Sequence, residues 1–119
     1  MNKLVIATQD HITFIDEDEI IYCRSDSNYT NIFMINTDEL LISKSLAKFS
    51  KELTQSKFIR VNQSYLVNIQ YIKSIDKRKR KIHLTNTMQI HFSSPIKDIL
   101  LKLGHKGIAI VGLFFSVGY

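Results

Sequence analysis

The segment from residue 58 to residue 75, FIRVNQSYLVNIQYIKSI, decides the fold and the function that we expect of this chain. Its polar residues Arg60, Asn62, Gln63 and Ser64 stand together between apolar neighbours that favour an extended backbone. An arginine beside two amides offers donors and acceptors of the kind that contact base edges in the major groove of DNA. The same residues would also suit a loop that satisfies only its own backbone, and their spacing favours neither interpretation.

The residues on the N-terminal side of this segment alternate between apolar and polar side chains. A period of two is typical of strands with one buried face. It is carried here by three pairs: Ile12 with Phe14, Ile20 with Tyr22, and Ile32 with Met34. The polar run Ser25-Asp26-Ser27-Asn28 predicts a tight connection between two of these strands. Residues 40–42 and 58–61 predict two further short strands.

The apolar spacing changes to three and four after residue 45. Leu46, Phe49 and Leu53 follow this spacing, with lysines between them, and predict an amphipathic helix. Ser43 or Ser45 stands where a side chain would cap the first turn.

A second helix is predicted near the C-terminus. Ser94 precedes Pro95, apolar positions recur at helical spacing from residue 96 to residue 103, and Gly104 follows. We therefore expect the serine to cap the helix, the proline to occupy its first position and the glycine to end it.

The remaining segments predict further short elements. Residues 64–72 favour a short helical turn that leads into a strand near residue 72, and residues 82–90 favour a hairpin that turns near Asn86. The basic run of residues 77–81, KRKRK, is expected at a hairpin turn. Together these patterns predict a mainly β fold with flanking helices, formed by many short strands and two main α-helices.

The charge of the chain is unevenly distributed. Residues 1–42 carry two basic and eight acidic side chains, a net of −6, and residues 43–119 carry fourteen basic and three acidic ones, a net of +11, which sum to the formal +5. Such asymmetry points to a nucleic acid or an anionic membrane surface, unless the two halves interleave in space and the charges average out.

Composition excludes several classes of protein. A hydrophobic fraction of 45% in 119 residues favours one folded domain over a disordered chain. The single cysteine cannot form an internal disulfide, and no apolar stretch has the length of a signal peptide core or a spanning helix, so we expect a cytoplasmic domain. The four histidines lack metal-ligand spacing, and neither a glycine-rich phosphate loop nor a nucleophile with its base stands out. We therefore expect no enzyme, no metal and no cofactor.

The segment 58–75 resembles the signature of the LytTR DNA-binding domain family, which has an arginine, a histidine, a polar residue and then Ser-Tyr/Phe-Leu/Val-Val-Asn before an isoleucine-rich strand. Three other landmarks resemble the family in order: the strand, loop and strand DEIIYCRSDSNYTNIFM, the helix ISKSLAKFSKEL, and the final strand, serine and helix MQIHFSSPIKDILLKL. The resemblance covers about residues 4–103, and we divide the chain into a LytTR-like domain (1–104) and an apolar tail of unknown role (105–119).

The resemblance implies a fold of several small antiparallel sheets and sequence-specific binding of double-stranded DNA by a bacterial transcriptional regulator, with loops inserted into successive major grooves. It further implies paired direct repeats as targets, a homodimer on DNA, and a receiver domain or sensor kinase as partner. The base-reading candidates that it gives are Tyr29, Asn62 and Gln63. The backbone-contacting candidates are Asn28, Thr30, Ser43, Lys44, Ser45, Arg60, Ser64, Ser93, Ser94 and Lys97.

The chain departs from the family pattern at two places. Asn62 stands where the family has a histidine, and Ser94 and Pro95 replace arginine at the start of the last helix. These departures predict either a different target sequence or reduced direct reading of bases. They also leave open an alternative, a LytTR-fold module that binds proteins and has lost specific DNA binding.

Overall fold

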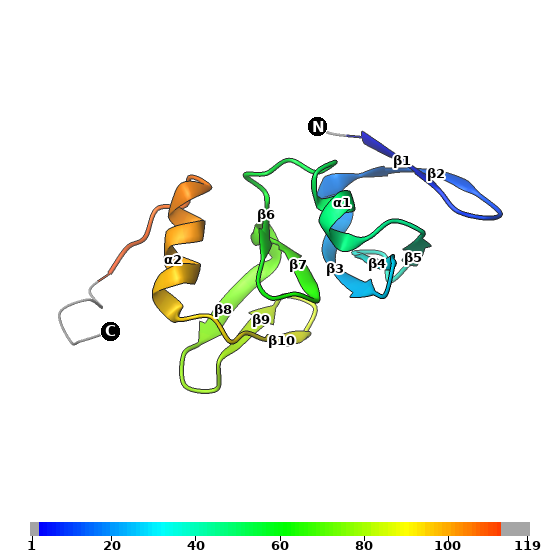
Figure 1. Cartoon of the computed structure of the whole chain (residues 1–119). Helices are drawn as coiled ribbons and strands as arrows, with labels where there is room; N and C mark the ends of the chain where they lie inside the picture. The colour runs from blue at the N-terminus through cyan, green and yellow to red at the C-terminus, as the bar shows by residue number, and fades with distance from the viewer. Residues whose placement is uncertain (1–2, 113–119) are drawn as a thin grey trace.

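The computed structural model describes residues 3–112 and confirms a mainly β fold with two α-helices (Figure 1). The strands are β1 (Lys3–Ala7), β2 (Ile12–Asp16), β3 (Ile20–Asp26), β4 (Tyr29–Met34), β5 (Glu39–Ile42), β6 (Phe58–Arg60), β7 (Tyr65–Asn68), β8 (Ile72–Asp76), β9 (Lys81–Leu84) and β10 (Gln89–His91). The helices are α1 (Leu46–Ser50) and α2 (Ile96–His105), and two 3-10 turns, η1 (Glu17–Glu19) and η2 (Ile69–Tyr71), precede β3 and β8. The strands form three antiparallel sheets, with the orders β1-β2, β10-β9-β8 and β5-β4-β3-β7-β6.

The five-stranded sheet separates two hydrophobic cores. Neighbouring residues of a strand point to opposite faces, and accordingly Leu66 of β7 joins one core while Val67 joins the other. The first core packs α1 and the β1–β2 hairpin against one face of the sheet, and the second packs α2 and the three-stranded sheet against the other. Figure 1 shows the same arrangement, with α2 and β8–β10 on one side and α1 with β1–β2 on the other.

Several predicted elements are confirmed. Ser27 and Asn28 form the two-residue turn between β3 and β4, with Ser27 at a φ of 58°. Ser45 caps α1, because its hydroxyl oxygen accepts from the backbone N–H of Lys48 at 3.2 Å. The predicted hairpin is β9–β10, and the basic run occupies the turn between β8 and β9 and the first residue of β9.

The prediction that Ile12 and Phe14 form the buried face of their strand was wrong. Ile12 and Phe14 of β2 are each 69% exposed, whereas Ile15 is buried. Phe14 pairs with Val5 across the hairpin, so these side chains share the outer face of a two-stranded ribbon that packs only its inner face on the domain. Alternation could not decide the face, because apolar residues occupy both faces of this ribbon.

The predicted ends of the last helix were also wrong. α2 begins after Pro95 without a side-chain cap, so Ser94 does not cap it, and Gly104 lies inside the helix. α2 ends at His105, and Gly107 follows it with a φ of 88°, which allows the Ile108 N–H to reach the Leu103 carbonyl at 3.1 Å. A residue in this left-handed conformation is what terminates a helix, and glycine adopts it without steric cost.

Residues 64–72 hold one further difference. The predicted helical turn and the strand at Ile72 are present as η2 and β8, but Tyr65–Asn68 form β7, which lies between β3 and β6 in the sheet. Within residues 3–112, no helix has the length and apolar composition that crossing a bilayer requires. Residues 113–119 of the apolar tail (105–119) lie outside the described residues, and Val111, within the described part of the tail, is 91% exposed.

Candidate nucleic-acid interface

The sheet topology brings the predicted DNA-contacting loops to one end of the domain. Because β3, β5 and β6 run antiparallel to β4 and β7, the ends of β3, β5 and β6 meet the starts of β4 and β7 at the same edge. The turn after β3, the segment after β5 and the loop between β6 and β7 therefore lie together. A bond of 2.8 Å from the Ser25 N–H to the Ser64 carbonyl joins two of them directly. We call this edge the loop end.

Acidic residues gather at the opposite end of the same sheet. η1 (Glu17–Glu19) precedes the start of β3, and the β4–β5 turn that contains Asp38 lies beside it, since the Ile35 N–H donates to the Glu19 carbonyl at 2.9 Å. Lys57 pairs there with Asp18 at 3.2 Å and with the buried Glu17 at 4.0 Å. The acids of residues 16–19 therefore lie at the opposite end of the sheet from the loop end. Asp26, at the end of β3, is an acidic residue that is exposed at the loop end itself.

The loop between β6 and β7 is held by its own side chains. The guanidinium of Arg60 donates from Nε to the Asn62 carbonyl at 2.8 Å and from Nη2 to the Gln63 carbonyl at 2.5 Å. Partial burial lowers the pKa of Arg60 from its usual value, although an arginine stays charged at any physiological pH. Arg60 therefore holds the backbone of the loop with two of its N–H donors, and its other N–H groups remain available to bind a ligand.

The side chain of Asn62 holds the loop within the domain. Its Oδ1 accepts from the backbone N–H groups of Ser64 at 2.7 Å and Tyr65 at 2.9 Å, and its Nδ2 donates to the His91 carbonyl at 2.8 Å. These bonds tie the loop to β10. Gln63 is exposed, and its side chain makes no hydrogen bond among the described residues.

The predicted contacts at the β3–β4 turn and after β5 also include both exposed side chains and a side chain that is bonded within the domain. Asn28 and Ser43 are exposed, and Tyr29 is 46% exposed. Thr30 is completely buried, and its hydroxyl donates to the Lys44 carbonyl at 2.7 Å, so the hydroxyl is not offered to solvent. This bond ties the start of β4 to the segment that follows β5.

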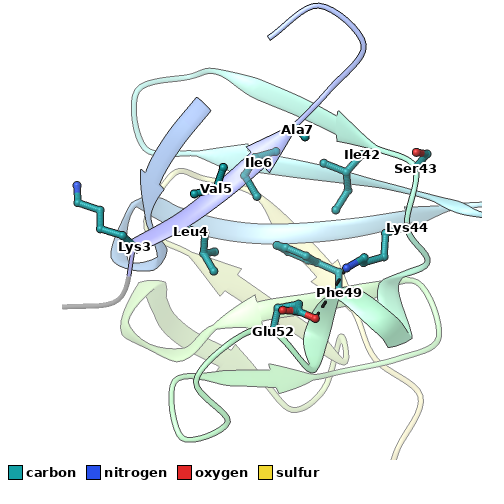
Figure 2. A pocket seen from close by; sticks show the side chains of 10 residues that line it. All are labelled: Lys3, Leu4, Val5, Ile6, Ala7, Ile42, Ser43, Lys44, Phe49 and Glu52. Carbon is teal, nitrogen blue, oxygen red and sulfur yellow. Dashed lines mark ion pairs between the residues drawn. The ribbon is translucent and has the colours of Figure 1, made fainter. Parts of the chain in front are cut away.

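Lys44 points along the surface toward α1. Figure 2 shows its ammonium directed to the carboxylate of Glu52, at 3.8 Å, on the rim of a hollow of about 470 Å³. The floor of this hollow contains Ile6, Ile42 and Phe49. Both partners of the ion pair are about half exposed, and such pairs contribute little to stability.

A second hollow of about 600 Å³ lies between the β6–β7 loop and the segment before α2. It is lined by Arg60, Val61, Asn62, Gln63, Ser64, Ser93, Ser94 and Lys102. Lys102 donates to the Arg60 carbonyl at 3.2 Å. The predicted contact Lys97 is exposed on α2 but does not line this hollow. The sequence pattern does not indicate Lys102 as a residue of the interface, because a lysine in the last turn of a helix is common for its interaction with the helix dipole.

The basic run contributes one inward-facing residue. The guanidinium of Arg80 lies 4.8 Å from the ring centroid of the buried Phe92, and its Nη2 donates to the Ser94 carbonyl. The Phe92 N–H in turn donates to the Arg80 carbonyl at 3.0 Å. Arg78, at the tip of the same turn, is exposed. Arg80 therefore fixes the segment before α2, which sequence alone did not indicate.

The described residues do not bring together the groups of a metal centre. Within residues 3–112, no three side chains of His, Cys, Asp or Glu are placed to hold an ion. Cys23 is buried in the first core, and this burial raises the pKa of its thiol well above the usual range. The thiol is therefore held in its protonated, unreactive form.

Comparison with known proteins identifies the family. The model of the LytTr DNA-binding domain matches residues 10–104. The sensory transduction protein LytT of Bacillus subtilis (strain 168) is 32% identical over 74 residues, which are 62% of this chain and 30% of that protein. The heme-containing CO-sensing transcriptional regulator RcoM 1 of Paraburkholderia xenovorans (strain LB400) is 27% identical over 82 residues, 69% of this chain and 30% of that protein. The chain thus spans about a third of the length of these relatives.

A solved structure shares the fold. The LytTr DNA-binding domain of a putative methyl-accepting/DNA response regulator from Bacillus cereus superposes with a TM-score of 0.71 at 21% identity, covering 87% of this chain and 96% of that one. The family match spans most of the chain, from the β1–β2 hairpin to the last turns of α2. The chain therefore belongs to the LytTr DNA-binding domain family.

Proposed function

We propose that this domain binds double-stranded DNA sequence-specifically through its loop end, as the DNA-binding part of a bacterial transcriptional regulator. The observation that carries the proposal is that strand topology gathers the turn after β3, the segment after β5 and the β6–β7 loop at one edge, while the acids of η1 lie at the other. Phosphate binding favours the edge that lacks the acids of η1, where Asp26 is exposed and Glu52 pairs with Lys44.

The size of the loop end supports contacts in more than one groove. Neighbouring strands lie about 4.8 Å apart, so the four steps from β5 to β6 span roughly 19 Å. The major groove is about 12 Å wide. The loop end is thus longer than the width of one groove, which supports the insertion of loops into successive major grooves.

Base reading is assigned to the exposed side chains of this edge. Gln63 has a free amide, which pairs in a bidentate manner with the N6 and N7 edge of adenine, and Tyr29 offers a hydroxyl and a ring face. Asn62 and Arg60 hold the loop that presents Gln63. We extend the proposal to paired direct repeats as targets, to a homodimer on DNA, and to a receiver domain or sensor kinase as the regulatory partner in the cytoplasm.

Selection from a random duplex library tests the proposal. The wild type is expected to enrich a defined motif. Gln63→Ala should relax the preference at one or two base pairs, since a good bidentate contact discriminates by about 1–3 kcal/mol, and Tyr29→Ala should do so at other positions. Gln70→Ala, which changes an exposed glutamine at the acidic end of the sheet, is the matched control. No enriched motif, or equal effects of Gln63→Ala and the control, would refute the proposal.

A second function, association with a second copy of this chain, is favoured by one observation. The outer face of the β1–β2 hairpin exposes Val5, Ile12 and Phe14 by 59%, 69% and 69%. Contiguous apolar exposure of this kind marks interaction sites in soluble proteins. Sedimentation of the wild type and of Phe14→Ser tests this function. Association that the substitution abolishes, without any loss of DNA binding, would support it.

A further inference from the structure

The hollow beside the β6–β7 loop has the chemistry of an anion site. Serine hydroxyl groups and the amide of Gln63 are among its lining groups, and no carboxylate of residues 3–112 lines it. Its cations are Arg60 and Lys102. Arg60 already gives two donors to loop carbonyls. Lys102 gives one donor to the Arg60 carbonyl, which leaves two of its three N–H bonds for a ligand.

The two walls of the hollow are held in place by contacts behind them. Asn62 ties the loop wall to β10 through the His91 carbonyl at 2.8 Å. Arg80 holds the other wall through its bond to the Ser94 carbonyl and its position over the ring of Phe92. A site that is formed before its ligand arrives avoids the cost of ordering side chains during binding.

We propose that this hollow binds one phosphate of the DNA backbone and that Lys102 supplies the charge that pairs with it. The inference rests on the proposed DNA binding and adds to it a contact from α2. It also accounts for the serine and proline at 94 and 95. The small side chain of Ser94 leaves the hollow open, and the positive charge comes from Lys102, about two turns further along the helix. Lys97 lies about 140° around α2 from Lys102 and faces away from the hollow's lining.

The test compares Lys102 with Lys73, an exposed lysine of β8. Binding of the full chain to a duplex that carries the selected motif is measured against salt concentration for the wild type, Lys102→Gln, Lys102→Arg and Lys73→Gln. Each phosphate contact contributes about 0.9 to the slope of log K against log salt. Lys102→Gln should therefore reduce the slope by about one, Lys102→Arg should retain it, and Lys73→Gln should leave it unchanged.

The slope of the salt dependence distinguishes loss of a phosphate contact from loss of folding. Lys102 also bonds to the Arg60 carbonyl. A smaller folded fraction of the variant lowers the apparent affinity at every salt concentration and leaves the slope intact. An unchanged slope for Lys102→Gln, or an equal reduction for Lys73→Gln, overturns the phosphate site while the DNA binding of the wild type stands. Failure of the wild type to bind any duplex overturns the proposed function itself.

Inorganic phosphate separates DNA from a free anion as the ligand. Without the other contacts of the loop end, a single phosphate should bind only weakly, and an NMR titration up to several millimolar should not saturate. Saturable binding at micromolar phosphate that Lys102→Gln abolishes would overturn the assignment to the DNA backbone.

Discussion

Replacing Arg80 with glutamine should destabilise the domain, whereas the same replacement at Arg78 should not. The two arginines lie two residues apart in one basic run, yet they meet different surroundings. Arg80 lies over the ring of Phe92, which has no exposed surface, and donates to the Ser94 carbonyl. Arg78 is exposed at the turn. A purely electrostatic view of the run would make them equivalent.

The magnitude follows from the two contacts. A cation over an aromatic ring contributes about 0.5–2 kcal/mol, and a hydrogen bond from a charged donor contributes about 1.5–3 kcal/mol. Glutamine keeps one amide donor but loses the charge, so we expect Arg80→Gln to lower the free energy of unfolding by about 2–3 kcal/mol. For a domain of this size that corresponds to a Tm lower by roughly 8–15 °C. Arg78→Gln should stay within about 0.5 kcal/mol of the wild type.

Thermal and urea unfolding followed by circular dichroism measure the stability, and the salt dependence of DNA binding provides the second readout. Arg78→Gln should reduce binding to motif and random duplexes by the same factor, because a phosphate contact carries no sequence information. Arg80→Gly is a further control, since Arg80 adopts a φ of 56° and glycine relieves the strain of this conformation. Equal Tm values for Arg78→Gln and Arg80→Gln would refute the reasoning.

Three further predictions concern other positions. Asn62→Ala should lower the free energy of unfolding by about 1–2 kcal/mol, because it removes the hydrogen bonds that join the β6–β7 loop to β10. Gln63→Ala, at the neighbouring position, should leave the free energy of unfolding nearly unchanged. Equal urea midpoints for the two variants would contradict this difference. Cys23 should resist alkylation in the folded protein at pH 8, because burial raises the pKa of its thiol. Above about pH 8.5 only the unfolded chain loses this proton, so the free energy of unfolding is retained below that pH and falls above it by about 1.4 kcal/mol per pH unit. Cys23→Ala should flatten this dependence in urea titrations across pH. Gly107→Ala should lower the stability by roughly 1 kcal/mol, because alanine is strained at a φ of 88°, whereas Gly104→Ala inside α2 should raise it or leave it unchanged in the same melts.

The sequence alone determined the local elements and the family. Turn chemistry at Ser27 and Asn28, the cap at Ser45 and the hairpin between β9 and β10 depend on residues close together in the chain, and here these local preferences agree with the global fold. The segment FIRVNQSYLVN also carried enough information to identify the family that the comparison confirms.

Tertiary structure decided which face of an element is buried and which polar groups are already occupied. Ile12 and Phe14 alternate like buried residues but lie on the open face of a two-stranded ribbon, because burial depends on what packs against a strand. Asn62 and Arg80 carry polar or charged groups that suit DNA, yet their partners His91 and Ser94 lie 29 and 14 residues away in the chain. A side chain's chemistry is written in the sequence, but its hydrogen-bond partners are fixed only when strands distant along the chain are brought side by side.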